Sequence, residues 1–331
     1  MDRLRMIEKI FFMILSSFVV VVFMSALVIA QEKYPSKPIT WTVGYAAGGV
    51  SDICTRAFAK AAEKTLKQPI VVVNKTGAAS SIQLQALKNS PPDGYTIGTL
   101  TMGGMLNTHL RETPYDPFKD FTHLAQFGNF LFGIAVHPDS PWKTLKEFVE
   151  YARQNPGKIK FGSFAPGSPA TLVGESFAFY NGFKMQLISY DGDTLAATAL
   201  LGKHIDAVVV TYSGWGPLVK AGRLRLLGVF YDARWKEFPD VPTVKELGYK
   251  YGGGFGTLSA LGPKNLPTYV KETLFTAFRE AFKDPEFTTI MDRNASPALY
   301  KEGEDWVRYL EEADKEAVSL MKKIGLTVIK E

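Results

Sequence analysis

Residues 39–66 read ITWTVGYAAGGVSDICTRAFAKAAEKTL, and this stretch decides the fold class. Its first five residues are mostly β-branched or aromatic, which predicts a strand over Ile39–Val43. A loop of small residues follows, from Ala46 to Asp52, and apolar residues then recur at helical spacing as far as Leu66. A strand, a glycine-containing loop and a helix in this order form the repeating unit of α/β folds.

The same unit occurs again in the second half of the chain. Lys158–Phe161 reads as a strand, Gly162–Ser168 is a second loop of small residues, and Pro169 stands where a helix would begin, with Ser168 as its cap. The alternation predicts an α/β protein with parallel, doubly wound sheets in two lobes of related architecture. Further strands are expected over 69–73, 95–100, 207–210 and 226–229, and further helices over 83–88, after the capping box Thr144-x-x-Glu147, and over 302–323.

The chain has 331 residues and an ordinary globular composition, with 46% hydrophobic and 21% charged residues. Its formal net charge is +5 and no run of five like charges occurs, so we expect no nucleic-acid partner and no polybasic membrane patch. A single cysteine, Cys54, excludes an internal disulfide framework and a multi-cysteine metal site. Only four scattered histidines are present, so we expect neither a metal nor a cofactor.

The N-terminus has the pattern of a targeting segment. Arg3, Arg5 and Lys9 precede an uncharged, mostly apolar run from Ile10 to Ile29, and a small residue, Ala30, stands at the end of that run. This pattern predicts a signal peptide over residues 1–30, cleaved after Ala30, and a periplasmic mature protein. The apolar run is longer than the 7–15 residues usual for a signal peptide, so an uncleaved single-span anchor is the alternative.

The two loops of small residues are the strongest candidates for a binding site. In Ala47–Asp52 and in Gly162–Ser168, small residues lead directly into a predicted helix. Unpaired backbone N–H groups and the positive end of the helix dipole favour an anion there, and glycine lets the backbone approach a ligand closely. The alternative is that both loops are simply tight turns between a strand and a helix. One such loop in each lobe favours a ligand in the cleft between the lobes.

A third group of polar residues follows the predicted strands of the second lobe. Tyr190 could close one wall of the cleft, and Asp191 could accept a hydrogen bond from an amine or hydroxyl of the ligand. Asp193 fits the cap of a small-residue helix over 194–201. Thr211 follows a strand and could supply a hydroxyl group, although ordinary loop exposure explains it equally well.

Catalytic patterns are weak in this sequence. The nucleophile-elbow, zinc-protease, P-loop and dinucleotide-binding motifs do not occur. His204 and Asp206 are expected to form a surface polar cluster, and Cys54 is expected to be a small buried residue. The sequence therefore predicts a binding protein without a catalytic site.

Several short motifs, in this order and spacing, resemble the substrate-binding proteins of tripartite tricarboxylate transporters, the Bug-type solute receptors. The resemblance extends from about Tyr34 to the C-terminus. The motifs are Tyr34-Pro35-Ser36-Lys37-Pro38-Ile39, Gly48-Gly49-x-x-Asp52, Pro92-Asp93-Gly94-Tyr95, Pro114-Tyr115-Asp116-Pro117-x-Lys119-Asp120-Phe121, Phe161-Gly162-Ser163, Leu200-Leu201-Gly202-x-x-x-Asp206, Lys220-Ala221-Gly222-Arg223-Leu224-Arg225 and Asp240-Val241-Pro242-Thr243.

The resemblance implies a two-lobed periplasmic binding protein fold of type II, with a two-strand hinge near Gly133–His137 and Gly252–Ser259. Lobe one would combine residues 31–135 and 255–331, and lobe two would be 136–254. The protein would capture a small organic acid in the cleft and deliver it to the membrane permease subunits of a tripartite transporter. The expected ligand-binding residues are Tyr45, Ala46, Ala47, Gly48, Gly49, Ser51, Asp52, Met102, Gly103, Ser163, Phe164, Ala165, Gly167, Ser168, Thr171, Tyr190, Asp191 and Thr211.

The sequence departs from the usual family pattern at several of these positions. The family usually has prolines where Gly44 and Ala47 stand, often a histidine at Thr171, a lysine at Asp191 and an acidic residue at Thr211. Its Gly-Ala-Gly-Gly segment reads Gly77-Ala78-Ala79-Ser80 here. Two alternative functions stay open at this point: a receptor that signals to a membrane sensor, and an exported enzyme that uses His204 or Asp191 as a general base.

Overall fold

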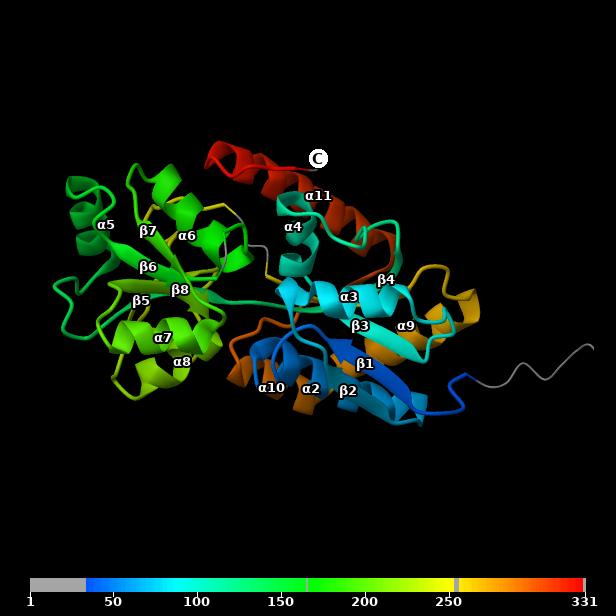
Figure 1. Cartoon of the computed structure of the whole chain (residues 1–331). Helices are drawn as coiled ribbons and strands as arrows, with labels where there is room; N and C mark the ends of the chain where they lie inside the picture. Colours follow the sequence, from blue (N-terminus) through cyan, green and yellow to red (C-terminus); the bar gives the residue numbers. More distant parts are fainter. Residues whose placement is uncertain (1–33, 165, 253–255, 330–331) are drawn as a thin grey trace, which may run out of the picture. The chain divides into compact units, whose positions relative to one another are not determined.

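A computed structural model describes residues 34–164, 166–252 and 256–329, and the fold is that of the unit Lys37–Glu331. The predicted signal peptide over 1–30 lies outside the described residues. Two separate sheets make up the fold, and each has helices on both of its faces (Figure 1). None of the helices within the described ranges combines the length and the apolar character needed to cross a bilayer.

The first sheet has the strand order β11-β4-β10-β3-β1-β2. Its strands are β1 (Ile39–Val43), β2 (Ile70–Asn74), β3 (Thr96–Thr101), β4 (Phe121–Asn129), β10 (Thr257–Pro263) and β11 (Lys301–Glu302). The helices of the same chain segments are α2 (Val50–Leu66), η1 (Ala78–Ser80), α3 (Ser81–Lys88), α4 (Met102–Leu110), α9 (Thr268–Phe282), α10 (Pro285–Arg293) and α11 (Gly303–Lys323).

The second sheet has the strand order β7-β6-β8-β5-β9. Its strands are β5 (Phe132–Val136), β6 (Lys160–Ser163), β7 (Gln186–Ser189), β8 (Ala207–Thr211) and β9 (Arg225–Phe230). The helices of this region are α5 (Leu145–Gln154), α6 (Pro169–Tyr180), α7 (Asp193–Leu201) and α8 (Tyr212–Lys220).

Alternation along β1 explains how the first sheet is covered on both faces. Trp41 is fully buried and lies 6.2 Å from the ring of Phe58 in α2 and 5.5 Å from that of Phe278 in α9. The next residue, Thr42, accepts a hydrogen bond from Gln83 of α3 at 2.9 Å. Successive side chains of a strand point to opposite faces, so α2 and α9 cover one face and α3 the other.

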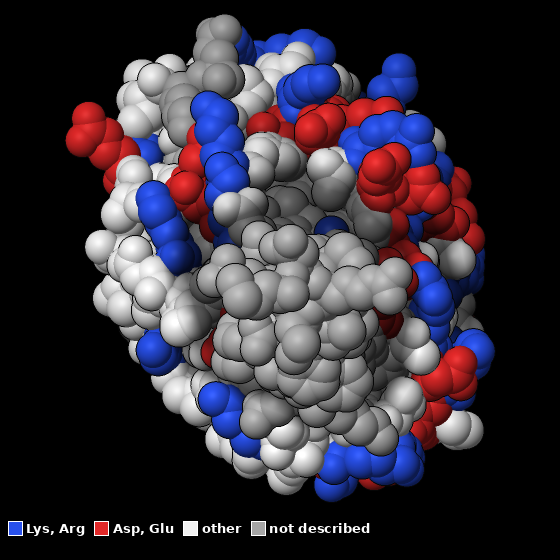
Figure 2. Space-filling view, turned by 90° about the vertical axis from the view of Figure 1, so that its right-hand side faces the viewer, with Lys and Arg blue, Asp and Glu red and all other residues white. Residues whose placement is uncertain are grey.

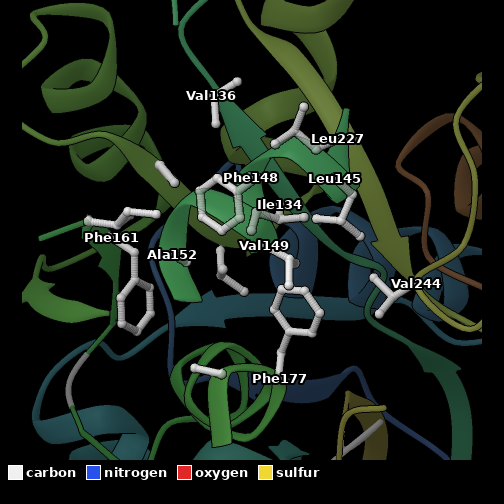
Figure 3. Close-up of a cluster of buried hydrophobic side chains, with 14 of the residues drawn as sticks. Ile134, Val136, Leu145, Phe148, Val149, Ala152, Phe161, Phe177, Leu227 and Val244 are labelled. Atoms are coloured by element: carbon white, nitrogen blue, oxygen red, sulfur yellow. The ribbon is translucent and has the colours of Figure 1, made fainter. Parts of the chain in front are cut away.

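The second sheet is also packed on both faces. Ile134 and Val136 lie in one buried cluster with Phe148 of α5 and Phe177 of α6 (Figure 3). Ala135, between them in β5, belongs to a different cluster that includes side chains of α7 and α8. A strand that is apolar on both faces must be central, which is the expected arrangement in a doubly wound sheet.

The structure confirms the two-sheet α/β fold, but neither sheet is entirely parallel. β10 runs antiparallel to β3 and β4, and β5 runs antiparallel to β8 and β9. In chain order each of these strands comes next after a strand of the other sheet, and the described residues between the two strands contain no helix. A parallel neighbour needs a crossover connection, whereas an antiparallel one does not.

The chain passes between the sheets twice. The first passage lies between Asn129, the end of β4, and Phe132, the start of β5. It precedes the expected hinge segment Gly133–His137, because β5 already pairs within the second sheet. The second passage lies between Phe230 and Thr257, and residues 253–255 in it are outside the described residues. The lobe limits 31–135 with 255–331 and 136–254 stay predictions.

Basic and acidic side chains are mixed on the surface. Figure 2 shows Lys and Arg next to Asp and Glu over the same parts of one face. Pairs such as Arg234–Glu246 and Lys220–Glu237, both at 2.9 Å, are examples of this local neutralisation.

Candidate functional site

The first predicted loop connects β1 to α2. Ala46, Ala47 and Gly48 are exposed, and Gly49 is the N-cap of α2 with an extended backbone. Gly48 has a φ of 81°, a left-handed conformation that favours glycine. No side chain caps the helix here, so the backbone N–H groups at its N-terminus receive no side-chain acceptor.

The first turn of α2 leaves donor groups available. In the part of the chain that the structure describes, the backbone N–H groups of Val50, Ser51 and Asp52 have no hydrogen-bond acceptor. This is the usual situation at a helix N-terminus, where the dipole also favours a negative charge. The nearby N–H groups of Gly48 and Gly49 are already used, by the Asp52 carboxylate at 2.9 Å and by the carbonyl of Ala46 at 3.3 Å.

Asp52 does not extend freely from the loop. Its carboxylate accepts hydrogen bonds from the Gly48 N–H, from Arg56 Nε at 2.9 Å and from Asn74 Nδ2 at 2.8 Å. Burial raises the pKa of Asp52, but the hydrogen bonds from these three donors outweigh it, so the pKa lies below its usual value. The side chain is thus an ionised acceptor that holds the loop in place.

A second helix N-terminus lies next to this loop. α4 begins at Met102 directly after β3, and Thr101 is its N-cap. The Tyr45 hydroxyl is 2.8 Å from the Thr101 hydroxyl, and burial raises the pKa of Tyr45. A Cβ atom added at Gly103 would lie 2.9 Å from the Tyr45 hydroxyl, so any larger residue here would have to displace that hydroxyl. The structure therefore brings Tyr45 and Gly103 together, whereas the Met102 side chain is fully buried in an apolar cluster with Leu100 and Met105.

The second predicted loop connects β6 to α6 as expected. Ser168 is the N-cap of α6, its hydroxyl accepts from the Thr171 N–H, and Pro169 is the first helical residue. The Thr171 hydroxyl donates to the Phe164 carbonyl at 2.9 Å, and the buried Ser163 hydroxyl donates to the Val209 carbonyl at 2.8 Å. Gly167 has a φ of 78°, as a tight turn requires. Ala165 lies outside the described residues.

The two loops are in contact through α4. A Cβ atom added at Gly103 would lie 3.6 Å from Pro169 Cδ, and one added at Gly167 would lie 1.9 Å from Leu110 Cδ1. Within the described residues, the Ala170 N–H in the first turn of α6 has no acceptor. The N–H donors at the start of α2 and at the start of α6 therefore follow two loops that both contact α4.

The third group is only partly as predicted. Asp191 is exposed and Tyr190 is partly buried, next to Gly162. Asp193 was expected to cap its helix, and this is wrong, since Gly192 is the N-cap of α7. The Asp193 carboxylate instead accepts from the Thr211 N–H, the Thr211 hydroxyl and the Ser213 hydroxyl. Burial raises the pKa of Asp193.

This contact explains the failed cap prediction. Asp193 is the first residue of α7, and its side chain turns toward the N-terminus of α8, where one N–H and two hydroxyl groups offer donors. The Thr211 hydroxyl is therefore engaged with Asp193 rather than free.

The residues considered as possible catalytic groups, Cys54, His204 and Asp206, are buried, exposed or hydrogen-bonded to the backbone. Cys54 is fully buried, as predicted, and burial raises the pKa of its thiol to about 12. His204 is exposed, and Asp206 accepts from the Lys160 N–H at 2.8 Å. Within the described ranges, no group of three or more His, Cys, Asp or Glu side chains is placed to hold a metal ion.

Two features beside the site were missed by the sequence analysis. Asn74, the last residue of β2, donates to the Tyr45 carbonyl and to Asp52. Ala78, Ala79 and Ser80 form a left-handed turn with φ values of 46°, 50° and 69°. The sequence signal for the turn was present in the run of small residues Gly77-Ala78-Ala79-Ser80, whereas a lone asparagine at a strand end gave none.

Comparison with known proteins places the chain in a family. Residues 54–326 match the model of the "Tripartite tricarboxylate transporter family receptor". A protein of Cupriavidus necator, described as a UPF0065 protein in the gbd 5' region, is 34% identical, and the match covers 89% of this chain and 90% of that protein.

Two solved structures share the fold over nearly their whole length. One, described as a periplasmic transporter, is 31% identical with a TM-score of 0.79, and the match covers 89% of this chain and 99% of that one. The other, the periplasmic binding protein BugD, is 27% identical with a TM-score of 0.78 and the same coverage. The chain therefore belongs to the tripartite tricarboxylate transporter receptor family (TctC, Bug), whose members are periplasmic solute receptors and not enzymes.

Proposed function

We propose that this receptor captures a small organic acid by its carboxylate in the cleft between its lobes and delivers it to the permease of a tripartite transporter. The observation that carries the proposal is the set of unpaired N–H groups at Val50, Ser51 and Asp52, beside an exposed loop without a cationic side chain. The family description, a receptor of tricarboxylate transporters, supports the same ligand class.

Backbone donors are sufficient for such a ligand. A hydrogen bond to a charged group contributes roughly 1.5–3 kcal/mol, so a few N–H groups can hold one carboxylate. The N-terminus of α6 supplies a further free donor at Ala170, in the loop that contacts α4. We therefore assign the ligand carboxylate to the N-terminus of α2, with Ser163–Thr171 on the opposite side.

We also propose that residues 1–30 export the chain and are then removed. The charged N-terminus and the apolar run support this, and the periplasmic relatives are consistent with it. The mass of the protein recovered from the periplasm tests the proposal. A mature chain that begins at Gln31 is expected, and a full-length, membrane-bound chain would contradict it.

Ligand-induced stabilisation tests the proposed function. Purified protein is heated with acetate, succinate, citrate, benzoate or glutamate, with ribose and spermidine as the neutral and cationic controls. At 100 times its dissociation constant a ligand adds about 2.7 kcal/mol of stability, which gives a clear increase in Tm. Stabilisation by none of the acids, or only by a control compound, would refute carboxylate capture.

A pair of variants tests the role of the backbone. Val50→Pro removes one N–H at the first position of α2, where proline fits and where Gly49 already has an extended backbone. Val50→Ala shortens the same side chain and keeps the N–H. We expect Val50→Pro to weaken binding about tenfold or more relative to Val50→Ala. Equal affinities would place the carboxylate elsewhere.

A further inference from the structure

Three side chains form a closed hydrogen-bonded ring beneath the first loop. Arg56 donates through Nε to Asp52 Oδ1 at 2.9 Å and through Nη2 to Asn74 Oδ1 at 2.9 Å. Asn74 in turn donates through Nδ2 to Asp52 Oδ1 at 2.8 Å. The ring therefore joins α2 to the end of β2, two elements that follow each other in the chain.

The ring holds the loop at both ends. Asn74 Nδ2 also donates to the Tyr45 carbonyl at 2.9 Å, at the start of the loop. Asp52 Oδ2 accepts from the Gly48 N–H at 2.9 Å, at its end. The residues between, Ala46 and Ala47, are exposed and have no polar side chain with which to fix themselves. One backbone hydrogen bond lies within the loop, from the Gly49 N–H to the Ala46 carbonyl at 3.3 Å, and the side chains of Asn74 and Asp52 supply the polar contacts that hold its two ends.

Such contacts matter for a site made of backbone. A loop that must be ordered when the ligand binds loses affinity by the cost of that ordering, and a loop fixed beforehand does not. Glycine at positions 48 and 49 makes the cost larger, because it has the most freedom to lose. A ring that orders the loop in the free protein would therefore increase affinity without touching the ligand.

We propose that Asn74 and Arg56 are positioning residues that fix the backbone of Tyr45–Gly48 in its ligand-binding conformation: Arg56 acts through Asp52, and Asn74 acts through Asp52 and directly on the Tyr45 carbonyl. This inference rests on the proposed function of the loop as the carboxylate site. The Asp52 side chain is 4% exposed and that of Arg56 is 47% exposed. The buried Asp52 carboxylate accepts from both side chains, and the hydrogen bonds from Arg56 and Asn74 keep it oriented toward the loop.

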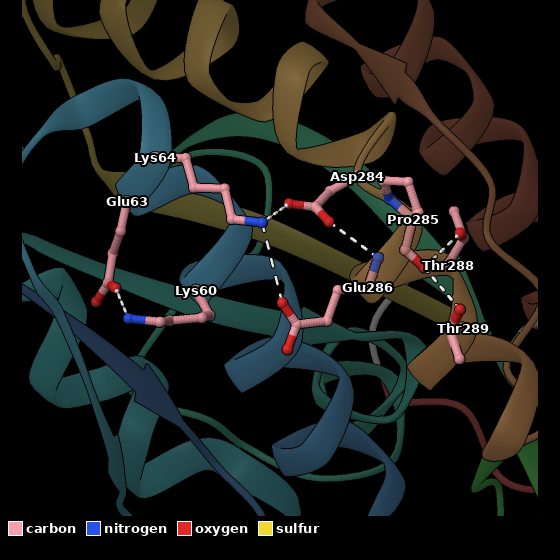
Figure 4. Close-up of polar contacts among 8 residues, drawn as sticks. All are labelled: Lys60, Glu63, Lys64, Asp284, Pro285, Glu286, Thr288 and Thr289. Atoms are coloured by element: carbon pink, nitrogen blue, oxygen red, sulfur yellow. Dashed lines mark hydrogen bonds and ion pairs between the residues drawn. The ribbon is translucent and has the colours of Figure 1, made fainter.

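The same helix offers a matched control. Lys60 is one turn further along α2, and its ammonium group forms an ion pair with Glu63 at 2.8 Å (Figure 4). The Lys60 side chain is 72% exposed, and among the described residues its hydrogen bond goes to Glu63 and not to the loop. Lys60→Gln therefore removes a cation and an ion pair of α2 but leaves the ring intact.

The experiment compares Asn74→Ala, Asn74→Asp and Arg56→Gln with Lys60→Gln. Asn74→Asp keeps the size of the side chain but removes its donors and brings a second negative charge to Asp52. Backbone amide exchange in residues 45–52 is measured in the ligand-free protein. Affinity is measured for whichever of acetate, succinate, citrate, benzoate and glutamate stabilises the wild type most.

We expect the three ring variants to exchange the Gly48 amide about tenfold faster and to bind about tenfold more weakly, with a Tm close to that of Lys60→Gln. Unchanged exchange in all three would overturn the inference. So would a Tm loss with unchanged affinity, since that result means a purely structural role. If no acid binds the wild type, the proposed function fails, and amide exchange still decides whether the ring fixes the loop.

Discussion

At the residue scale, the backbone at Ala79 is a point of strain beside the site. Ala79 is exposed and has a φ of 50° and a ψ of 51°, and a left-handed conformation costs a residue with a Cβ about 1–2 kcal/mol. We expect Ala79→Gly to remove the strain. Glycine also raises the entropy of the unfolded chain, which offsets part of the gain, so the net stabilisation should be about 1 kcal/mol.

The control for this prediction is an alanine with ordinary geometry in the next helix. Ala86 lies within α3, so Ala86→Gly is expected to destabilise by roughly 0.5–1 kcal/mol. Chemical denaturation of both variants measures the difference. If Ala79→Gly destabilised the protein as much as Ala86→Gly does, the turn at Ala79 would not be strained in solution.

The candidate site could be predicted from the sequence where backbone alone defines it. Runs of small residues before a predicted helix drew attention to Ala47–Asp52 and Gly162–Ser168, because glycine and a capping residue such as Ser168 are visible in the sequence. Side-chain partners could not be predicted. Asn74 and Asp193 find their donors and acceptors on other elements, and only the assembled sheets bring those together.

At the scale of elements, Ser168 at the N-terminus of α6 has two roles: it caps the helix, and it is a predicted ligand-binding residue. Its hydroxyl accepts from the Thr171 N–H and donates to the Thr171 hydroxyl at 3.0 Å. Loss of an N-cap costs about 1 kcal/mol, so we expect Ser168→Ala to lower the Tm by about 2–4 °C.

Ser168→Asp separates the two roles. Aspartate is as good an N-cap as serine, so the Tm should stay near that of the wild type. Its negative charge would repel a carboxylate held nearby, so the affinity for the best acid of the panel should fall. Calorimetry and melting curves measure both effects. Unchanged affinity in Ser168→Asp would place the ligand away from α6.

Elements with a strong local pattern were predicted within about two residues. The predicted strand 39–43 coincides with β1, the predicted helix 302–323 with α11 apart from its first residue, and the capping box at Thr144 with the start of α5. The local pattern did not predict β10, because Thr257–Pro263 ends in Gly262 and Pro263, and only the resemblance placed a hinge strand near it, at Gly252–Ser259. Its strand conformation results from antiparallel pairing with β3 and β4, which is non-local.

At the scale of the whole molecule, a buried acid links stability to pH. Glu175 lies on α6, and one of its carboxylate oxygens is buried without a hydrogen-bond partner among the described residues. Burial raises the pKa of Glu175 to about 7. The ordinary glutamate value is near 4.3, so the folded protein holds this proton over a range of pH in which the unfolded chain has already released it.

The sign of the effect follows from this proton. Stability falls with rising pH wherever the folded state binds more protons, which for Glu175 means from about pH 4.3 to about pH 7. Burial also raises the pKa of Asp193, so its contribution has the same sign. Glu175→Gln has no proton to lose, and its Tm should exceed that of the wild type above pH 7 by about 2–4 °C, because partial exposure screens part of the cost.

Melting curves of the two proteins between pH 4 and pH 8 measure this difference. Below pH 4.3 glutamic acid and glutamine are both neutral, so the two Tm values should converge.

Glu147→Gln is unsuitable as a control, since the Glu147 carboxylate accepts from the Lys143 N–H at the start of α5. Glu150→Gln is suitable, because Glu150 is exposed on α5 and its ion pair with Lys146 is 4.0 Å long. A Tm difference that is the same at every pH would mean that Glu175 titrates as an ordinary surface acid and that the fold does not bury it as a charge.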